Sequence, residues 1–197
     1  MISWESIISP YSLLHTGLFK PPPEWSSGLA NVFWDFQNLA LRTNGYAYKR
    51  ARHHALYFQG FLTSLQSRLI HLGDCLDDPI ENLVRLTMLS LLTTMAKVPG
   101  RKIPYLWIKE QLGDAYAKTA GRLCKVDTSL HLWVLVTVAL TITGAKEDWL
   151  VDAWGKTESG LGWAKVKNHL MQVMWIEVIH DKPGEIVFQD LEHLRSV

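Results

Sequence analysis

Histidines are the side chains of this sequence best suited to acid–base chemistry, because an imidazole titrates near neutral pH. No Ser or Cys in a recognisable nucleophile pattern accompanies them, so ordinary structural histidines are the competing interpretation. If the chain is an enzyme, His131 or a pocket acid is the candidate proton handler. The histidines considered are His53, His54, His71, His131 and His169.

Carboxylates, cysteines and histidines do not form a metal-binding pattern. The stretch "DCLDD" at 74–78 could hold magnesium for a diphosphate, since carboxylates bridge such metals. Asp78-Pro79-Ile80-Glu81 is instead typical of a helix start, with Asp78 as the N-cap and Glu81 reaching back to the backbone. No histidine pair has i, i+4 spacing and the two cysteines stand alone, so we expect no metal and no cofactor.

Two glycine-containing stretches resemble phosphate-binding loops only in part. "GKT" at 155–157 would need its first loop glycine at Leu150, and "GLG" at 160–162 has Lys165 where a third glycine is required. Neither stretch follows a predicted strand, which both kinds of loop require. We interpret both as turns.

The charge balance excludes non-specific nucleic-acid binding as a main role, because the 20 Lys and Arg residues are nearly equalled in number by 19 Asp and Glu residues. The one concentrated basic run, residues 49–54, is either a nuclear import signal or phosphate contact, or a solvated turn. Cys75 and Cys124 fit a reducing interior rather than a disulfide scaffold. We expect an intracellular protein, nuclear or cytoplasmic, without direct nucleic-acid contact.

The longest apolar stretch, Leu130 to Ile142, has 13 residues, whereas a bilayer span needs about 20. We therefore expect a buried helix and no membrane association. The N-terminus has neither a basic leader nor a small-residue cleavage site and does not resemble a secretory signal.

Apolar spacing is helical almost throughout, without convincing period-two alternation. It predicts an all-α, single-domain helical array of about seven or eight helices over residues 1–197, with 1–45 as a candidate looser segment. The first expected helix starts near Ser26 or Ser27 and stops at Asn44-Gly45, and the second ends at Gly73. The next three helices are expected from Asp78 to Pro99-Gly100, from about 104 to 123 with Gly113 as a candidate bend, and from 127–129 to Gly144. The last three are expected over 146–154, from Trp163 to about His180, and, after a turn at Lys182-Pro183-Gly184, to beyond Leu194.

Nine tryptophans are the most unusual feature of the composition. Large rings fill gaps between helices, and that explains most of them. The functional alternative is an apolar ligand pocket, since such pockets combine apolar walls with a few polar groups. The candidate lining residues are Trp107, Trp133, Trp163 and Trp175.

Three stretches, from about residue 60 to 195, carry a resemblance to a known family: "DDPIENLVRLTMLSLLTTM" at 77–95, "SLHLWVLVTVALTITGAKEDWLVDAW" at 129–154 and "WAKVKNHLMQVMWIEVIHDKPGEIVFQDL" at 163–191. Their order resembles the C-terminal part of the fungal-specific transcription factor domain, the regulatory region of zinc binuclear cluster transcription factors. The matching positions are Glu81, Arg85, Leu86, Trp133, Glu147, Asp148, Trp149, Val166, Lys167, Leu170 and Trp175.

The resemblance implies a helical regulatory domain. These positions are core and helix-boundary patterns rather than catalytic ones. The family's DNA-binding part holds two zinc ions with six cysteines, which two cysteines cannot supply. The chain is also shorter than the family's regulatory regions, and Val138 stands where many members have a glycine.

Three functions remain open at this point. The first is a non-enzymatic, effector-binding regulatory domain that binds a small apolar ligand or a protein partner and acts by a population shift. The second is a free-standing biosynthetic enzyme of secondary metabolism, a cofactor-free cyclase or isomerase that preorganises a hydrophobic substrate. The third is a protein-interaction module, such as a homodimer.

Overall fold

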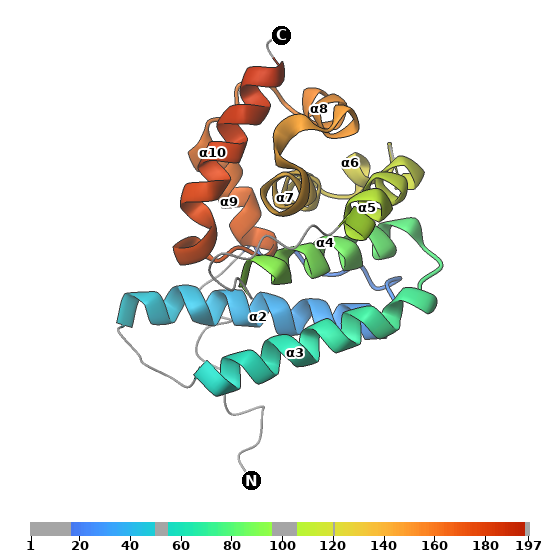
Figure 1. The fold of residues 1–197 in the computed structure, drawn as a ribbon, viewed down its shortest axis with the longest axis vertical. Coiled ribbons are helices and arrows are strands. Elements are labelled where there is room, and N and C mark those ends of the chain that lie inside the picture. Colours follow the sequence, from blue (N-terminus) through green and yellow to red (C-terminus); the bar gives the residue numbers. More distant parts are fainter. Residues whose placement is uncertain (1–16, 50–54, 96–105, 120, 196–197) are drawn as a thin grey trace.

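A computed structural model describes residues 17–49, 55–95, 106–119 and 121–195, and every regular element in these ranges is helical (Figure 1). This confirms the predicted all-α fold class. None of the helices in these ranges combines the length and the apolarity needed to cross a bilayer. The α-helices are α2 (Ser27–Lys49), α3 (Ala55–His71), α4 (Pro79–Met95), α5 (Leu106–Thr119), α6 (Leu123–Val126), α7 (Thr128–Val138), α8 (Asp148–Gly155), α9 (Trp163–Val173) and α10 (Glu177–Arg195).

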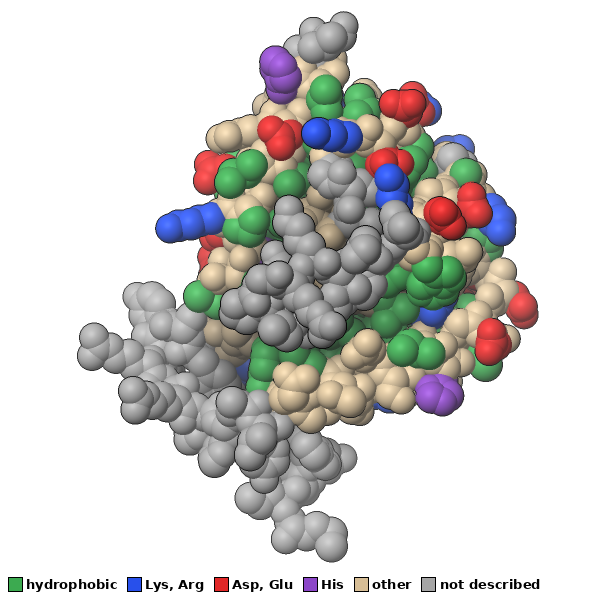
Figure 2. All heavy atoms as spheres, in the orientation of Figure 1, with side chains coloured by type: hydrophobic (Ala, Val, Ile, Leu, Met, Phe, Trp, Pro, Cys, Tyr) green, Lys and Arg blue, Asp and Glu red, His purple; other side chains and the backbone are tan. Residues whose placement is uncertain are grey.

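Helix α7 lies at the centre of the array, surrounded by the other helices (Figure 1). Helix α4 packs beside it and against α5, while α9 and α10 cover its other side. Helices α2 and α3 lie next to each other below α4, and α8 lies above α7 in this view. Charged side chains of both signs are interspersed along the upper and right-hand rim of the surface (Figure 2).

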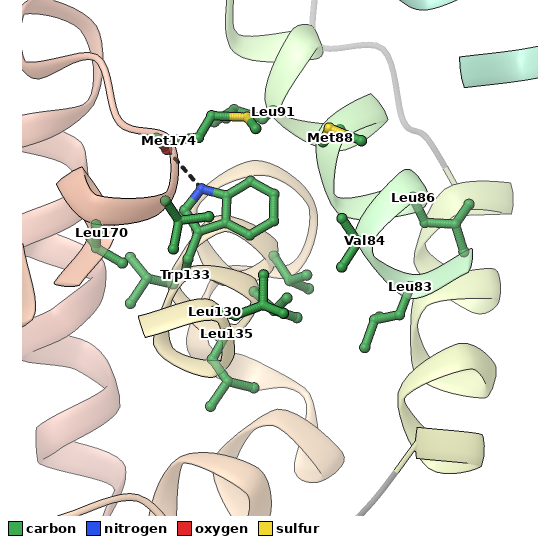
Figure 3. Close-up of a cluster of buried hydrophobic side chains, with 14 of the residues drawn as sticks. Leu83, Val84, Leu86, Met88, Leu91, Leu130, Trp133, Leu135, Leu170 and Met174 are labelled. Carbon is green, nitrogen blue, oxygen red and sulfur yellow. Dashed lines mark hydrogen bonds between the residues drawn. The ribbon is translucent and has the colours of Figure 1, made fainter. Parts of the chain in front are cut away.

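The apolar run predicted as a buried helix is confirmed as the centre of the core. Every residue from 129 to 138 is buried, so α7 has no polar face, as expected for a helix enclosed on all sides. Trp133 is fully buried between α4 and the end of α9, and its indole Nε1 donates to the Met174 carbonyl over 2.7 Å (Figure 3). Beyond Val138 the backbone widens into a π-helix over Ala139–Thr143.

Aspartates start two of the helices: Asp78 as predicted, and Asp127 as one of the three cap candidates at 127–129. Asp127 accepts from the Leu130 amide over 2.9 Å, and Asp78 accepts from the Ile80 and Glu81 amides over 2.6 and 3.4 Å. The reciprocal role predicted for Glu81 is wrong. Its carboxylate accepts instead from the Ser26 amide over 2.9 Å, so it stabilises the start of α2 across the fold.

Two predictions based on glycine positions, one helix end and one candidate bend, are wrong. Helix α2 does not stop at Asn44-Gly45 but continues to Lys49, and α5 runs through Gly113 without a break. Gly113 lies against the Trp149 ring, where an added Cβ would be 3.4 Å from the indole nitrogen, an ordinary van der Waals distance. The predicted break at Pro99-Gly100 lies outside the described residues.

The boundary between the last two long helices also differs from the prediction. Helix α9 ends at Val173, and α10 runs from Glu177 through Pro183 and Gly184, where a turn was expected. Gly184 is buried against Trp175: an added Cβ would lie 2.7 and 2.9 Å from two atoms of that ring. The glycine therefore permits a close approach between a helix and an indole.

Candidate functional site

The corner between α9 and α10, residues Met174–Ile176, is buried although its backbone is not helical. Each of the three residues is at most 1% exposed, and Met174 adopts an extended conformation with φ −172° and ψ 103°. Buried peptide groups outside regular structure need hydrogen-bond partners, because an unpaired one costs free energy comparable to a lost hydrogen bond. At this corner, side chains of other helices supply them.

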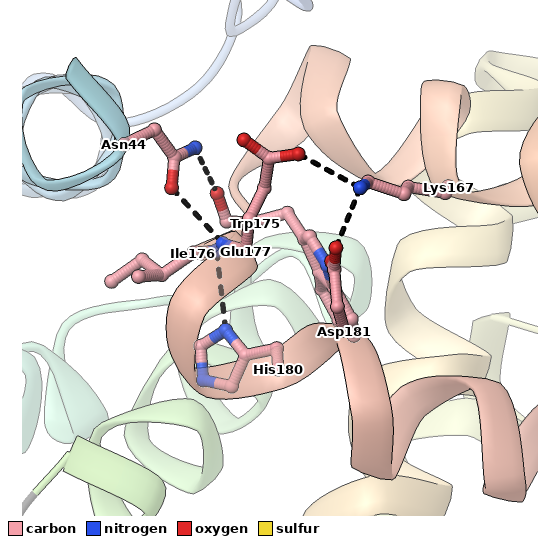
Figure 4. Close-up of polar contacts among 7 residues, drawn as sticks. All are labelled: Asn44, Lys167, Trp175, Ile176, Glu177, His180 and Asp181. Atoms are coloured by element: carbon pink, nitrogen blue, oxygen red, sulfur yellow. Dashed lines mark hydrogen bonds and ion pairs between the residues drawn. The ribbon is translucent and has the colours of Figure 1, made fainter. Parts of the chain in front are cut away.

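Asn44 of α2 provides two of these partners (Figure 4). Its Nδ2 donates to the Trp175 carbonyl over 2.8 Å, and its Oδ1 accepts from the Glu177 amide over 3.0 Å. The Trp133 indole of α7 holds the preceding carbonyl, that of Met174. The conformation of the corner therefore depends on α2 and α7, which are distant in sequence.

His180 completes the corner from within α10. Its Nδ1 accepts from the Ile176 amide over 3.2 Å, and its Nε2 lies 2.8 Å from the Thr94 hydroxyl of α4. Since that hydroxyl donates to the Leu91 carbonyl over 2.7 Å, it can only accept from Nε2. These contacts assign the proton of the fully buried ring to Nε2.

An ion-pair network borders the corner on its outer side (Figure 4). Lys167 lies 2.8 Å from Glu177 and 2.6 Å from Asp181, and Asp181 also accepts from the Trp175 indole over 2.9 Å. Although burial opposes it, hydrogen bonds to Asp181 and Glu177 raise the pKa of Lys167. The network combines one positive charge with two negative charges, so it carries a net charge of −1 on the outer side of the corner.

A cleft of about 300 Å³ lies between α2 and α9, beside the corner. This volume is at the lower end of the range for small-molecule sites. Among residues 17–49 and 121–195, no ionisable side chain belongs to its wall. The lining residues, which define the cleft below, are Gly17, Leu18, Gln37, Ala40, Leu41, Asn44, Asn168, Met171, Gln172, Val173, Met174 and Trp175.

Gln37 is the most deeply buried polar side chain of the cleft, with 2% of its surface exposed. Its Nε2 faces three carbonyl oxygens, those of Phe19, Gln172 and Val173, at 3.2, 3.2 and 2.8 Å. Three acceptors fix the orientation of the amide, because only the nitrogen carries hydrogens. Gln37 thereby caps the C-terminus of α9, and no residue in the described ranges donates to its Oε1.

The four predicted pocket tryptophans are distributed over different parts of the fold. Trp175 lines the cleft, and Trp163 packs edge-on against it with ring centroids 6.2 Å apart. Trp133 lies in the core, where its indole donates to the Met174 carbonyl of the corner. Trp107 lies near the start of α5 and is 58% exposed.

Sequence reasoning missed the amide side chains Gln37 and Asn44. One signal for Gln37 was present: it shares the buried face of α2 with Phe33 and Ala40, at i, i+4 and i+7 spacing. A polar residue on an apolar stripe must find a buried partner. Nothing local indicates that Asn44 holds residues 175 and 177.

His131, the predicted proton handler of an enzyme, lies outside the cleft. It is 6% exposed and its Nε2 is 3.1 Å from the Tyr116 hydroxyl. Burial lowers the pKa of His131, and burial raises the pKa of Tyr116 to about 12. The pair is therefore neutral over the physiological range.

The other candidate histidines differ in setting. His169 Nδ1 lies 2.9 Å from the Ser129 hydroxyl, which itself donates to Gln172 Oε1 over 2.7 Å, so the imidazole donates to Ser129 rather than activating it. His71 is exposed. His53 and His54, with most of the basic run at 49–54, lie outside the described residues.

Metal-binding groups are not assembled in the described part of the chain: no three His, Cys, Asp or Glu side chains there are placed to hold an ion. Asp78 of the acidic stretch binds helix amides and Arg122 instead. Although burial opposes it, hydrogen bonds from the Ile80 amide, Arg122 and the Glu81 amide lower the pKa of Asp78. Cys75 and Cys124 are exposed free thiols.

Comparison of the chain with family models, with curated proteins and with solved structures finds no match. Function is therefore inferred from the corner, the cleft and the residues that form them.

Proposed function

We propose that this chain is a regulatory domain that binds a small effector molecule in the cleft between α2 and α9. The observation that carries the proposal is the Gln37 amide, whose nitrogen is committed to three carbonyls while its oxygen has no donor among the described residues. That oxygen is not enclosed by the protein, and water or another molecule in the cleft has to supply its hydrogen. A ligand in the cleft can do so.

The proposed mechanism is a population shift. The cleft and the corner share Asn44, Met174 and Trp175, so an occupant contacts the groups that hold α10 against α2. A ligand that prefers this arrangement of helices stabilises it over alternatives in which the corner opens. The surface that α10 presents to a protein partner then depends on occupancy.

The resemblance to the fungal-specific transcription factor domain supports a regulatory role, acting without direct contact with DNA and, in this proposal, in the nucleus. Its matching positions include Lys167 and Trp175, which belong to the α9–α10 corner and its ion-pair network. The proposal places the function at this junction rather than in a catalytic centre.

A thermal-shift screen of small metabolites, followed by native mass spectrometry of the hits, tests this function. A ligand present at about 100 times its Kd stabilises the folded state by about 2.7 kcal/mol, which is readily detected. Fusion to a heterologous DNA-binding domain should then give reporter transcription that depends on the hit. A screen without a hit, together with no bound partner protein, would overturn the proposal.

A further inference from the structure

We infer that the cleft selects an uncharged amide, a carboxamide or lactam with a small apolar group, over a charged metabolite of the same size. This inference rests on the proposed effector-binding function and concerns the chemistry of its ligand. It follows from the charge, the hydrogen-bonding groups and the apolar area of the cleft wall.

Charge favours a neutral occupant. The part of the cleft wall formed by the described residues contains no Asp, Glu, Lys, Arg or His. The nearby ions Lys167, Glu177 and Asp181 are paired with one another. An anion or cation entering the cleft would lose hydration without gaining a counter-ion, which is strongly unfavourable.

Hydrogen-bonding groups of the wall complement an amide. Gln37 Oε1 is an acceptor without a donor in the described ranges. Asn44 Nδ2 uses one of its two hydrogens for the Trp175 carbonyl, and the Gln172 amide uses its oxygen for Ser129. Donors therefore remain on Asn44 and Gln172, which line the same cleft as the Gln37 acceptor. A carboxamide or lactam presents N–H and C=O side by side and matches this set.

The rest of the wall is apolar and adaptable. Leu18, Leu41 and Met171 line the cleft and are partly exposed. Methionine adjusts to ligands of different shape because its side chain is unbranched and polarizable. With about 300 Å³ available, these side chains fit a short branched chain or a small ring.

Three probes with the same branched carbon skeleton test the inference: isovaleramide, isovalerate and isoamylammonium, which are neutral, anionic and cationic, with ε-caprolactam as the lactam. Each is titrated into the full chain carrying ¹³C-methyl methionine. Met171 and Met174 line the cleft, whereas Met88 and Met95 lie on α4 and serve as internal references. We expect the two amides to shift the Met171 and Met174 methyl signals saturably, with affinities at least ten-fold above those of the two ions.

Paired variants on α9 locate the binding. Met171→Trp fills the cleft and should weaken amide binding at least ten-fold, while Lys165→Trp adds the same ring at an exposed position away from the cleft and should change it less than two-fold. The methyl signals of the unaltered protein give the same information if the Met171 variant fails to fold.

The outcomes separate the ligand class from the effector function. Equal or tighter binding of isovalerate or isoamylammonium at Met171 overturns the amide class and leaves an effector cleft in place. Absence of any shift at Met171 and Met174 with both amides also overturns the amide class. The screen above decides the effector function independently, because its hits are not restricted to amides.

Discussion

Replacement of Asn44 by alanine should destabilise the protein by loosening the α9–α10 corner. The substitution removes the hydrogen bonds to the Trp175 carbonyl, 2.8 Å, and from the Glu177 amide, 3.0 Å. At about 1 kcal/mol of net stabilisation for each hydrogen bond, the expected loss is about 2 kcal/mol. Because Asn44 is half-buried, water can partly replace it, so we do not expect a larger penalty.

Asn38→Ala provides the matched control. Asn38 is exposed on the same helix, so both variants gain the same helix propensity, up to about 0.7 kcal/mol. The difference between the two variants therefore isolates the two hydrogen bonds. For a domain of this size, about 2 kcal/mol corresponds to a difference in Tm of about 4–8 °C.

Urea denaturation followed by circular dichroism measures this difference, with amide hydrogen exchange at Glu177 as a local readout. We expect the Asn44 variant to unfold at lower urea with an unchanged m-value and to exchange the Glu177 amide faster. Free energies of unfolding within about 0.5 kcal/mol of each other for the two variants would refute the role assigned to Asn44.

Three further predictions concern packing, pH and helix capping. Gly184→Ala should destabilise the protein by about 1–3 kcal/mol, because its Cβ would overlap a buried indole. Gly60→Ala has open space around it and should stabilise the protein by up to about 1 kcal/mol. Thermal melts in which both variants change Tm in the same direction contradict the close-packing account. Burial lowers the pKa of His131, so below pH ~6.5 the folded chain binds fewer protons than the unfolded chain and loses stability as the pH falls. Urea denaturation between pH 7.5 and 5.5 should therefore show a smaller loss of unfolding free energy for His131→Gln than for the unaltered protein. The same dependence of unfolding free energy on pH in both proteins would count against this role of His131. Asp78→Ala should cost about 1 kcal/mol by removing the N-cap of α4, and a melt unchanged at neutral pH would argue against this cap.

Helix starts were predictable from the sequence because the groups that define them are local. Asp78 and Asp127 each accept from amides two or three residues ahead, so the capping pattern is contained in a short stretch. The buried helix over 128–138 was predictable for a similar reason, since a mostly apolar run too short to span a bilayer packs in the core.

Helix ends and the cleft were not predictable, because they depend on contacts between distant residues. A Pro-Gly pair normally signals a turn, but Gly184 is required by the Trp175 ring that lies against it. The actual break at residues 174–176 is stabilised by Asn44, Trp133 and His180. Those partners lie between 4 and 131 residues away in the chain, and only the His180 contact is local.

Tryptophan content drew attention to the second half of the chain but did not indicate how its rings are used. Trp133 and Trp175 act mainly through their indole nitrogens, which hold the Met174 carbonyl and Asp181. Aromatic residues with a polar group are suited to this role, because the ring fills space while the N–H satisfies a buried acceptor. The prediction that Trp175 lines a ligand site stays a prediction until a ligand is observed.

Hydrogen–deuterium exchange with and without the tightest-binding compound of the effector screen tests the central claim most directly. Binding in the cleft should slow exchange of the amides of residues 172–177 and of the facing half of α2, because the ligand stabilises the contacts that close the corner. Slower exchange confined to α5 or α8, with the corner unchanged, would contradict a ligand site between α2 and α9.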